Sequence, residues 1–281
     1  MSALPLHLVI QGPGVTDATA VTLRELSSAQ GIEVLGEQAF RLLDAQHHTE
    51  VAEYCRARRI DYGYVPATAK LADFRLLAMD MDSTLITIEC IDELADMARM
   101  RAKVSSVTAA AMRGEIHFAE SLRRRVALLE GLPVAALEHV YQERLHLSPG
   151  AETLLAHARS LGIKTLLVSG GFTYFVDRLK TRLKLDYTRS NVLEVRDDKL
   201  TGRVLGHIFD AQGKVAALRE TCTELGITPQ QAMVLGDGAN DLPMMTAAGV
   251  SIAYHAKPIV RQQATYALNH CGLDGVLNLF P

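Results

Sequence analysis

Two aspartates, Asp80 and Asp82, stand directly after an apolar run that has the length of a strand. The run covers residues 74–79, and its nearly continuous apolar character is typical of a strand buried on both faces of a parallel sheet. Ligands of open α/β sheets bind at the carboxyl ends of strands, so these acids are expected at the mouth of a site. They could hold a divalent cation, or one could attack an electrophile while the other transfers protons. A polar turn that caps a helix is the alternative for this pair taken alone.

Two more polar loops follow later apolar stretches of the chain. Ser169-Gly170-Gly171 comes after a predicted strand at 164–168, and the loop 236–241 comes after a predicted strand at 232–235. Lys214 begins the predicted helix that precedes the second of these strands. Because the carboxyl ends of parallel strands meet at one edge of a sheet, all of these residues are expected to converge on the two aspartates.

Together these residues supply what the hydrolysis of a phosphate monoester requires. Asp80 can attack phosphorus and form an aspartyl phosphate. Asp82 can protonate the leaving alkoxide and then deprotonate the water that releases phosphate. Lys214, the Ser169 hydroxyl and the Gly170 N–H can bind the non-bridging oxygens, where charge accumulates in the transition state.

A nucleophilic carboxylate must approach a doubly negative phosphate, and a cation would offset that repulsion. Asp80, Asp82 and Asp237 offer oxygen donors without any cysteine, which suits magnesium. Dinucleotide binding is the competing interpretation of an α/β chain. It is disfavoured because the first of these strands ends in acids, which repel a pyrophosphate, and because no G-x-G-x-x-G string follows it.

The elements that must position these loops alternate between strands and helices of ten or more residues. This alternation favours an α/β fold with a Rossmann-like, doubly wound parallel sheet. Residues 90–146 interrupt it with four consecutive helices, which we interpret as a helical cap inserted after the first strand. The cap helices are predicted at 91–100, 104–113, 118–130 and 134–145. The remaining predictions are helices at 151–161, 172–183 and 214–225, a hairpin at 187–208, a strand at 249–254 and a helix from 273.

Residues 1–72 are predicted to form a small α+β domain of their own, and residues 73–281 the large one. The small domain should contain strands at 6–10, 32–35 and 60–65, helices at 17–30 and 48–58, and a linker at 66–73. Its β-α-β-(β)-α-β order and its turn PGVTDAT are similar to an ACT-like amino-acid-binding domain. That similarity implies ligand sensing, while packing or dimerisation is the alternative, and a homodimer is compatible with either.

Composition narrows the class of protein. The chain has 281 residues, 48% hydrophobic and 22% charged, which is ordinary for a globular protein with a sizeable core. Its net charge of −3 and the lack of a long basic block argue against nucleic acid or an anionic membrane as the main partner. No apolar run reaches membrane length. The four cysteines lie far apart without a CxxC pair, so a disulfide framework or zinc site is disfavoured and a cytoplasmic location is expected.

The string DMDSTL at residues 80–85 resembles the first motif of the haloacid dehalogenase (HAD) superfamily, whose phosphatases carry DxDx(T/V). Ser169, Lys214 and the string GDGAND at residues 236–241 match its later motifs in order, so the resemblance covers residues 74–281. It implies a HAD-like fold and hydrolysis of a phosphomonoester with magnesium.

The same resemblance implies a role for each acid. Asp80 would be nucleophile and magnesium ligand, and Asp82 would be the general acid and base that binds magnesium through its main-chain carbonyl. Asp237 would be the third protein ligand. Asn240 would lie near the phosphate or the metal, and Asp241 would be an orienting carboxylate.

Glu89 and the segment 114–126, GEIHFAESLRRRV, resemble the phosphoserine phosphatases in particular, whose cap segment reads G-x-x-x-F-x-x-S-L-x-x-R-V. This implies hydrolysis of O-phospho-L-serine to L-serine and phosphate, the last step of serine biosynthesis. Glu89 would receive the substrate ammonium and Arg125 would hold the carboxylate, a task for which a planar guanidinium is suited. Phe118 and Met112 would supply apolar lid contacts.

Several alternatives stay open at this point. The arginines at 123–125 could form a solvated helix face, since at most one or two of three successive helical residues can enter a cleft. Phe118 could be a core residue. The substrate could be another small phosphate, such as phosphothreonine or homoserine phosphate. A serine-sensing regulatory protein is the alternative from another class, although the intact set of acids argues against it.

Overall fold

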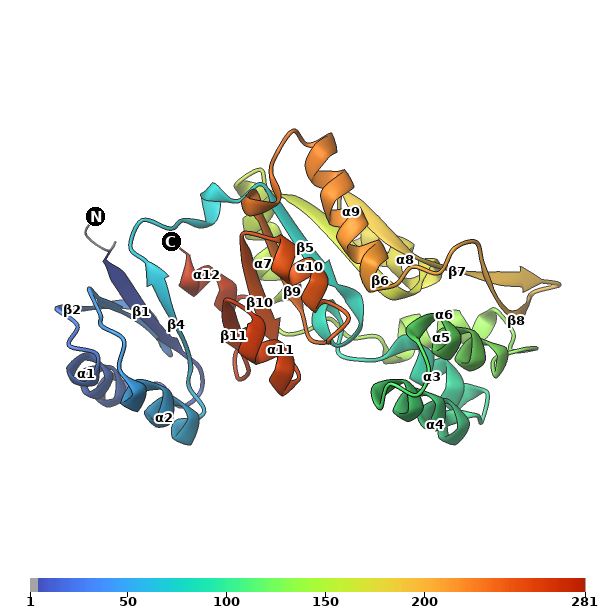
Figure 1. The fold of residues 1–281 in the computed structure, drawn as a ribbon, viewed down its shortest axis with the longest axis horizontal. Coiled ribbons are helices and arrows are strands. Elements are labelled where there is room, and N and C mark those ends of the chain that lie inside the picture. The colour runs from blue at the N-terminus through green and yellow to red at the C-terminus, as the bar shows by residue number, and fades with distance from the viewer. Residues whose placement is uncertain (1–4, 281) are drawn as a thin grey trace.

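The computed structural model describes residues 5–280, which form two sheets with their helices (Figure 1). A four-stranded sheet lies at one end, and a seven-stranded sheet forms the body of the molecule. The cap helices gather at the opposite end. Within residues 5–280, no helix has the length and apolar character needed to cross a membrane.

The amino-terminal module, residues 5–66, has the connectivity β-α-β-β-α-β of ferredoxin-like folds. Thr16 caps the first helix with its side chain, and Ala20 and Leu23 bury the apolar face of that helix. The strand order is β2-β3-β1-β4, and all neighbouring pairs are antiparallel. The elements are β1 (Leu6–Gln11), α1 (Asp17–Leu26), β2 (Gly31–Gly36), β3 (Ala39–Leu43), α2 (Thr49–Arg58) and β4 (Asp61–Pro66). The predicted element order is confirmed, while the ACT likeness and the domain boundary stay predictions.

The large sheet has the strand order β11-β10-β9-β5-β6-β7-β8. Its pairs are parallel except for the last, β7 with β8, which is the predicted hairpin. The left-handed residues Asp197 and Asp198 form the hairpin turn. The strands are β5 (Leu76–Asp80), β6 (Lys164–Phe172), β7 (Tyr187–Arg196), β8 (Lys199–Leu205), β9 (Ala232–Gly236), β10 (Val250–Tyr254) and β11 (Tyr266–Leu268).

Helices cover both faces of this sheet, which confirms the doubly wound prediction. All five residues of β5 are buried, and alternate side chains enter different cores. Leu76 and Ala78 pack in a core with α9, α10 and α11, whereas Leu77 and Met79 belong to the core that contains α7, α8 and α12. These helices are α7 (Ala151–Ser160), α8 (Thr173–Leu183), α9 (Ala211–Glu224), α10 (Leu242–Ala247), α11 (Pro258–Gln263) and α12 (Gly275–Leu279).

The cap consists of four helices, α3 (Cys90–Met97), α4 (Arg101–Met112), α5 (Phe118–Ala127) and α6 (Ala135–His139). The fourth is shorter than predicted, because the chain continues as a wider helical turn at Val140–Arg144. The β7–β8 hairpin holds this cap. Gly131 N donates to Leu200 O at 2.8 Å, Leu200 N donates to Leu132 O at 2.9 Å, and Val134 N donates to Asp198 O at 2.9 Å.

Some elements depart from the predictions. The short elements α10, α11 and β11 were not expected, since each has six residues or fewer and depends on packing against the body rather than on a long periodic pattern. The expected turn at Ser169–Gly171 instead belongs to β6, whose pairing with β7 shifts in register between Val168 and Phe172. The expected final helix is a single short one, α12.

Hydrogen bonds connect the amino-terminal module to the body. Asp61, at the start of β4, accepts hydrogen bonds from the main-chain N–H groups of Asn269, His270 and Cys271 at 2.8–2.9 Å. Gln11 donates to Gly275 O at 3.0 Å and accepts from the Asn278 side chain at 2.7 Å. The predicted linker is likewise packed, since it contains a short helical turn, Leu71–Asp73, whose Leu71 is buried.

Candidate active site

The carboxyl end of β5 presents the two predicted catalytic aspartates. Asp80 is the last residue of the strand, and its Oδ1 accepts a hydrogen bond from Met81 N at 2.7 Å. The turn that follows, Met81–Leu85, is irregular, because Asp82 and Ser83 have non-helical backbone angles and Ser83 has a φ of 56°. This geometry lets Asp82 Oδ1 accept from Cys90 N at 3.0 Å, which ties the turn to the first cap helix.

Lys214 lies between two of the predicted acids. Its Nζ is 2.8 Å from Asp80 Oδ2 and 2.7 Å from Asp241 Oδ1, and all three side chains are almost completely buried. Asp210 caps α9 by accepting from the N–H groups of its first turn, which fixes the start of the helix that carries Lys214. Lys214 therefore holds the carboxylate of Asp80, the predicted nucleophile, in a fixed orientation.

A cluster of carboxylates surrounds the same point. Asp80, Asp237 and Asp241 each place an oxygen within 4.8 Å of the others. The loop after β9 can come this close because Gly236 has no side chain: a Cβ there would lie 2.6 Å from the Asp241 carboxyl carbon. Asp241 is further held by Gly238 N, which donates to its Oδ2 at 3.1 Å.

Burial and mutual repulsion shift the pKa values of these groups. Burial, followed by the charge of Asp241, raises the pKa of Asp80 well above its ordinary value of 3.8. Burial and then the charge of Glu89 raise the pKa of Asp82 to about 7, and burial and then Asp241 raise that of Asp237 to about 6. Burial alone would lower the pKa of Lys214, but Asp241 and Asp80 more than offset it, so the lysine stays protonated.

These observations fit a divalent cation. One lysine cannot neutralise three converging carboxylates, and the raised pKa values of Asp80 and Asp237 reflect that excess of negative charge. All the converging donors are oxygens, which hard cations prefer. The carboxylate of Asp82 lies outside this cluster, so the predicted contact through its main-chain carbonyl stays a prediction.

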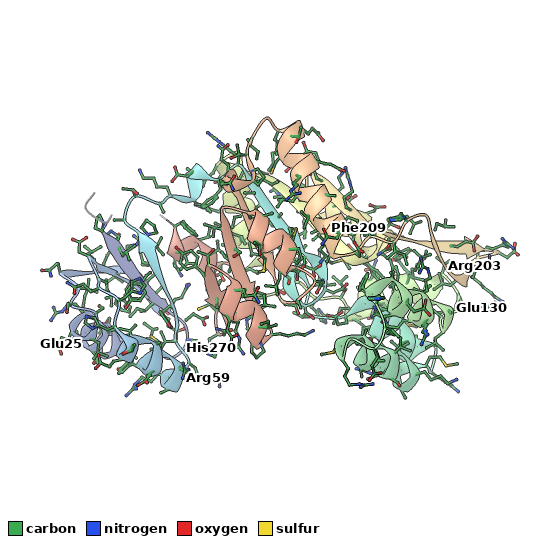
Figure 2. The ribbon with its side chains drawn as sticks, in the orientation of Figure 1. Glu25, Arg59, Glu130, Arg203, Phe209 and His270 are labelled. Carbon is green, nitrogen blue, oxygen red and sulfur yellow. The ribbon has the colours of Figure 1, made fainter. Side chains whose placement is uncertain are left out.

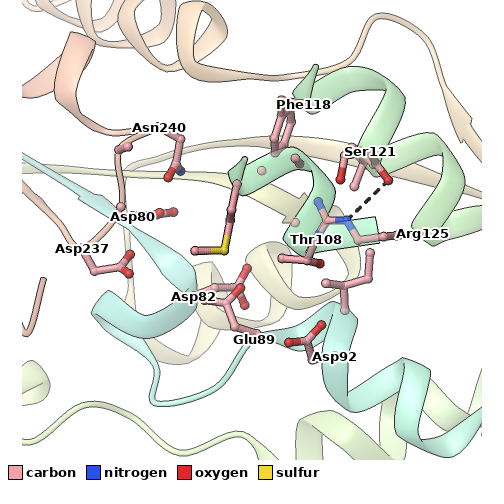
Figure 3. Close-up of a pocket in the computed structure, with 18 of the residues that line it drawn as sticks. Asp80, Asp82, Glu89, Asp92, Thr108, Phe118, Ser121, Arg125, Asp237 and Asn240 are labelled. Atoms are coloured by element: carbon pink, nitrogen blue, oxygen red, sulfur yellow. Dashed lines mark hydrogen bonds between the residues drawn. The ribbon is translucent and has the colours of Figure 1, made fainter. Parts of the chain in front are cut away.

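A pocket of about 430 Å³ opens in front of the cluster, between the sheet edge and the cap. Figure 3 shows its two ends: Asp80, Asp237 and Asn240 lie at one, and Arg125 lies with Ser121 at the other. Nine of the predicted site residues line it, namely Asp80, Asp82, Glu89, Met112, Phe118, Arg125, Gly170, Asp237 and Asn240. The structure thus brings together residues that are up to 160 positions apart (80 to 240).

Glu89 and Arg125 carry opposite charges into the pocket. Ser83 donates its hydroxyl to Glu89 Oε1 at 2.7 Å, which fixes the carboxylate. Arg125 Nε lies 3.4 Å from the main-chain oxygen of Ser121, one helical turn earlier. Burial lowers the pKa of Arg125, although the neighbouring acids, Asp92 first among them, counteract this. Arg125 is half-buried and lines the pocket, whereas Arg123 and Arg124 are exposed.

Two apolar cap residues, Phe118 and Met112, line the pocket. A Cβ built on Gly170 would lie 3.0 Å from Phe118 Cζ, so the glycine lets the cap approach the sheet edge. Met112 also lines the pocket, with 69% of its surface exposed. Phe118 is thus a pocket residue rather than only a core residue.

Ser169 and Lys214 are buried and do not line the pocket. The Ser169 hydroxyl is buried and accepts a hydrogen bond from Gly171 N at 2.8 Å. Its proton remains available to an acceptor. Contact of either side chain with a phosphate stays a prediction.

The sequence predictions missed four polar residues of the lining, Asp92, Thr108, Ser121 and Lys257. Lys257 follows strand β10, so the rule that placed the other loops at the sheet edge could have found it. Ser121 and Asp92 lie one helical turn from Arg125 and Glu89 respectively, which is the spacing of neighbours on one helix face.

Comparison with known proteins decides the family. Residues 74–249 match the model of the haloacid dehalogenase-like hydrolases. The chain belongs to this family. Residues 8–60 match a family described only as a domain of unknown function. The resemblance to HAD phosphatases, drawn from the motifs, is confirmed.

Among HAD-like hydrolases, the chain is similar to proteins named as phosphoserine phosphatases. One from Polaromonas sp. (strain JS666) is 58% identical over 215 residues, covering 75% of this chain and 91% of that protein. The structure of a probable phosphoserine phosphatase from Vibrio cholerae, 38% identical, has a TM-score of 0.86 and covers 98% of this chain and 86% of its own. A phospho-aspartyl intermediate analogue of phosphoserine phosphatase, 36% identical, has a TM-score of 0.69 over 74% of this chain and 99% of its own.

Proposed function

We propose that this chain hydrolyses O-phospho-L-serine to L-serine and phosphate through an aspartyl phosphate on Asp80, with magnesium as its metal. The observation that carries the proposal is that Glu89 and Arg125 line the same pocket as Asp80 and Asp82. Phosphoserine has a phosphate at one end and a zwitterionic ammonium and carboxylate at the other, and the pocket offers complementary groups at both ends. The similar proteins named as phosphoserine phosphatases support the same substrate.

Two aspartates would carry out the covalent chemistry. A carboxylate oxygen of Asp80 attacks phosphorus while the bond from phosphorus to the serine oxygen breaks. Asp82 gives its proton to the departing alkoxide, then takes a proton from the water that cleaves the aspartyl phosphate. A pKa of about 7 suits Asp82 for both transfers, because the group is readily protonated and deprotonated near neutral pH.

Asp80, Asp237 and the main-chain carbonyl of Asp82 would hold the magnesium ion. When bound, it supplies positive charge that offsets the repulsion between the nucleophile and the phosphate. Lys214 keeps Asp80 in place through its 2.8 Å ion pair, and Asp241 in turn holds Lys214.

The remaining predicted residues would bind substrate. Glu89 receives the ammonium, Arg125 holds the carboxylate, and Phe118 and Met112 cover the bound molecule. Ser169, Gly170 and Asn240 would bind the phosphate oxygens, on which negative charge accumulates in the transition state.

The cellular location and the metabolic role of the enzyme belong to the same proposal. All four cysteines are free thiols, three of them buried, which is compatible with a reducing cytoplasm. There the reaction would complete serine biosynthesis. A homodimer is part of the same proposal.

Phosphate release from L-phosphoserine in the presence of magnesium tests the proposal, with Asp80→Asn as the first variant. We expect turnover in the wild type that requires magnesium and a loss of at least about 10³-fold in Asp80→Asn, since nucleophile and metal ligand are both impaired.

Glu89→Gln then tests the substrate. It should reduce turnover of phosphoserine far more than turnover of p-nitrophenyl phosphate, which has no ammonium. Equal losses on the two substrates would favour another small phosphomonoester. If the wild type cleaved neither substrate, a serine-sensing regulatory protein would be the better interpretation.

A further inference from the structure

A second cleft, of about 720 Å³, lies where the amino-terminal module meets the body. Helix α2 and strand β4 line one side, and α11 and β11 line the other. Figure 2 shows His270 at this junction, between the ribbon of the module and that of the body. Its larger volume and its separate lining distinguish the cleft from the pocket in front of Asp80.

The charges that line this cleft are unbalanced. Arg56 from the module and Arg261 from the body are both exposed, and neither forms an ion pair within residues 5–280. Arg261 has only a 3.3 Å hydrogen bond to the Asn269 amide oxygen. Asp61 is the one acid of the lining, and it is 2% exposed and accepts three main-chain hydrogen bonds. Its charge is thus already compensated, which leaves two guanidinium groups without an anionic partner.

The walls of the cleft are held in place. A Cβ on Gly63 of β4 would lie 2.7 Å from Cδ1 of Tyr266 in β11, so the two strands approach as closely as a glycine permits. On the module side, the His47 ring lies against that of Tyr64 at a centroid distance of 3.8 Å. A pre-formed cleft with fixed walls binds a small ligand without a large ordering cost.

The body side of the cleft continues into the active site. Helix α11 carries Arg261 and starts directly after Lys257, which lines the active-site pocket. Lys257 N donates to the main-chain oxygen of Asp237 at 3.1 Å. A ligand that pulls on Arg261 therefore acts on a short helix whose first turn is bonded to the loop of a predicted metal ligand.

We propose that this cleft binds a small anion through Arg56 and Arg261, and that its occupation alters catalysis through α11. The ligand class is a carboxylate or phosphate oxyanion, the groups that a guanidinium binds with two parallel hydrogen bonds. The site is independent of the substrate assigned above, since none of its residues lines the active-site pocket.

The test compares the wild type with the Arg56→Gln/Arg261→Gln double variant, which keeps polar side chains and removes both charges. Arg58→Gln is the matched control, because Arg58 is also on α2 but covers the Tyr54 ring and does not line the cleft. L-serine is the carboxylate probe and inorganic phosphate the phosphate probe, with potassium chloride at equal ionic strength as the blank. Hydrogen exchange of residues 256–268 and 50–64 reports occupation, with magnesium present throughout.

We expect one of the two anions to slow exchange in both segments of the wild type and of Arg58→Gln. The double variant should need at least about tenfold more anion for the same protection. Both anions can also enter the active site, but that binding would persist in the double variant, so the comparison separates the two sites. Protection that is absent with both anions, or equal in the double variant, would overturn the anion site.

Steady-state kinetics on the substrate that the enzyme cleaves tests the coupling. Without added anion, the double variant should keep kcat/KM within twofold of the wild type. With the anion, the kcat of the wild type should change more than that of the double variant, because L-serine that attacks the aspartyl phosphate would lower kcat in both proteins alike. An equal change in both would overturn the coupling. An unchanged kcat in the wild type at an anion concentration that protects α11 would overturn the coupling.

Discussion

At the scale of single residues, Ser121 stands out because its buried hydroxyl has no hydrogen-bond partner among residues 5–280. It lines the pocket one helical turn before Arg125, at the end proposed for the serine part of the substrate. A buried polar group without a partner costs free energy, and this cost is recovered when a ligand supplies the partner. Ser121 is therefore well placed to bond the carboxylate or ammonium of the substrate.

Ser121→Ala should raise KM for phosphoserine about tenfold, since a hydrogen bond to a charged group contributes about 1.5–3 kcal/mol. The free energy of unfolding should not fall, because no native hydrogen bond is lost. Ser190→Ala is the matched control: its hydroxyl is also buried without a partner, but it does not line the pocket. Kinetics and urea unfolding of both variants check this, and a similar rise in KM in both would contradict it.

The raised pKa values of Asp82 and Asp237 predict how the metal-free protein responds to pH. Both groups bind protons more tightly in the folded state than at their ordinary value of 3.8. Their contribution to stability is therefore fully present below about pH 4 and is lost as pH rises through about 6 and then about 7. A divalent cation replaces the lost protons at higher pH, since carboxylates must be ionised to bind it.

We expect magnesium to raise Tm more at pH 8 than at pH 5, as measured by thermal unfolding with and without the metal. Asp237→Asn removes one ionisable ligand. Without metal, raising the pH from 5 to 8 should lower its Tm less than that of the wild type, and magnesium should raise its Tm only slightly. Equal stabilisation by magnesium at both pH values would show that these carboxylates do not titrate in this range.

At the scale of elements, the β7–β8 hairpin connects the sheet to the cap. Gly202 in β8 has a φ of 76°, and a Cβ there would lie 3.1 Å from Glu130 Cβ and 3.2 Å from Ala127 Cα. Gly206, just after the strand, has a φ of 72° and nothing within 4 Å of such a Cβ. The two glycines thus share the backbone conformation but only one touches the cap.

Gly202→Ala should therefore destabilise the protein more than Gly206→Ala. Both pay about 1 kcal/mol for a left-handed alanine, and only the first must also displace the end of α5. Because α5 carries Phe118 and Arg125, Gly202→Ala should also raise KM for phosphoserine severalfold, while Gly206→Ala should not. Urea unfolding and steady-state kinetics measure both effects; equal losses in the two variants would mean that the hairpin does not position the cap.

At the scale of the whole molecule, Asp61 is the main polar link between the module and the body. Its three hydrogen bonds from residues 269–271 join segments more than 200 positions apart.

Asp61→Ala should lower the free energy of unfolding by at least about 3 kcal/mol, because it leaves three N–H groups without their acceptor. Asp73→Ala removes a local bond from Lys70 N and should cost about 1 kcal/mol or less. Urea unfolding compares them, and limited proteolysis near residue 70 should be faster only in Asp61→Ala.

The local pattern of the chain was enough to predict the sheet, the cap and most of the site. Apolar strands that end abruptly in acids, hydroxyls and glycines are visible without a structure, and parallel topology then sends them to one edge. For this reason Asp80, Asp82 and Asp237 could be expected to converge, as the pocket and the carboxylate cluster confirm. The motif resemblance extended this to Glu89 and Arg125, whose charges alone did not distinguish a pocket from a solvated surface.

The tertiary structure decided what depends on contacts between distant segments. Short elements such as α11 and β11 have too little periodicity to be recognised, and they form because the body packs against them. The position of Lys214 between two carboxylates, the unpartnered hydroxyl of Ser121 and the docking of Asp61 all depend on distances across the fold. Burial, and with it every pKa shift in the site, follows from that packing, whereas the residue types that make the chemistry available were already written along the chain.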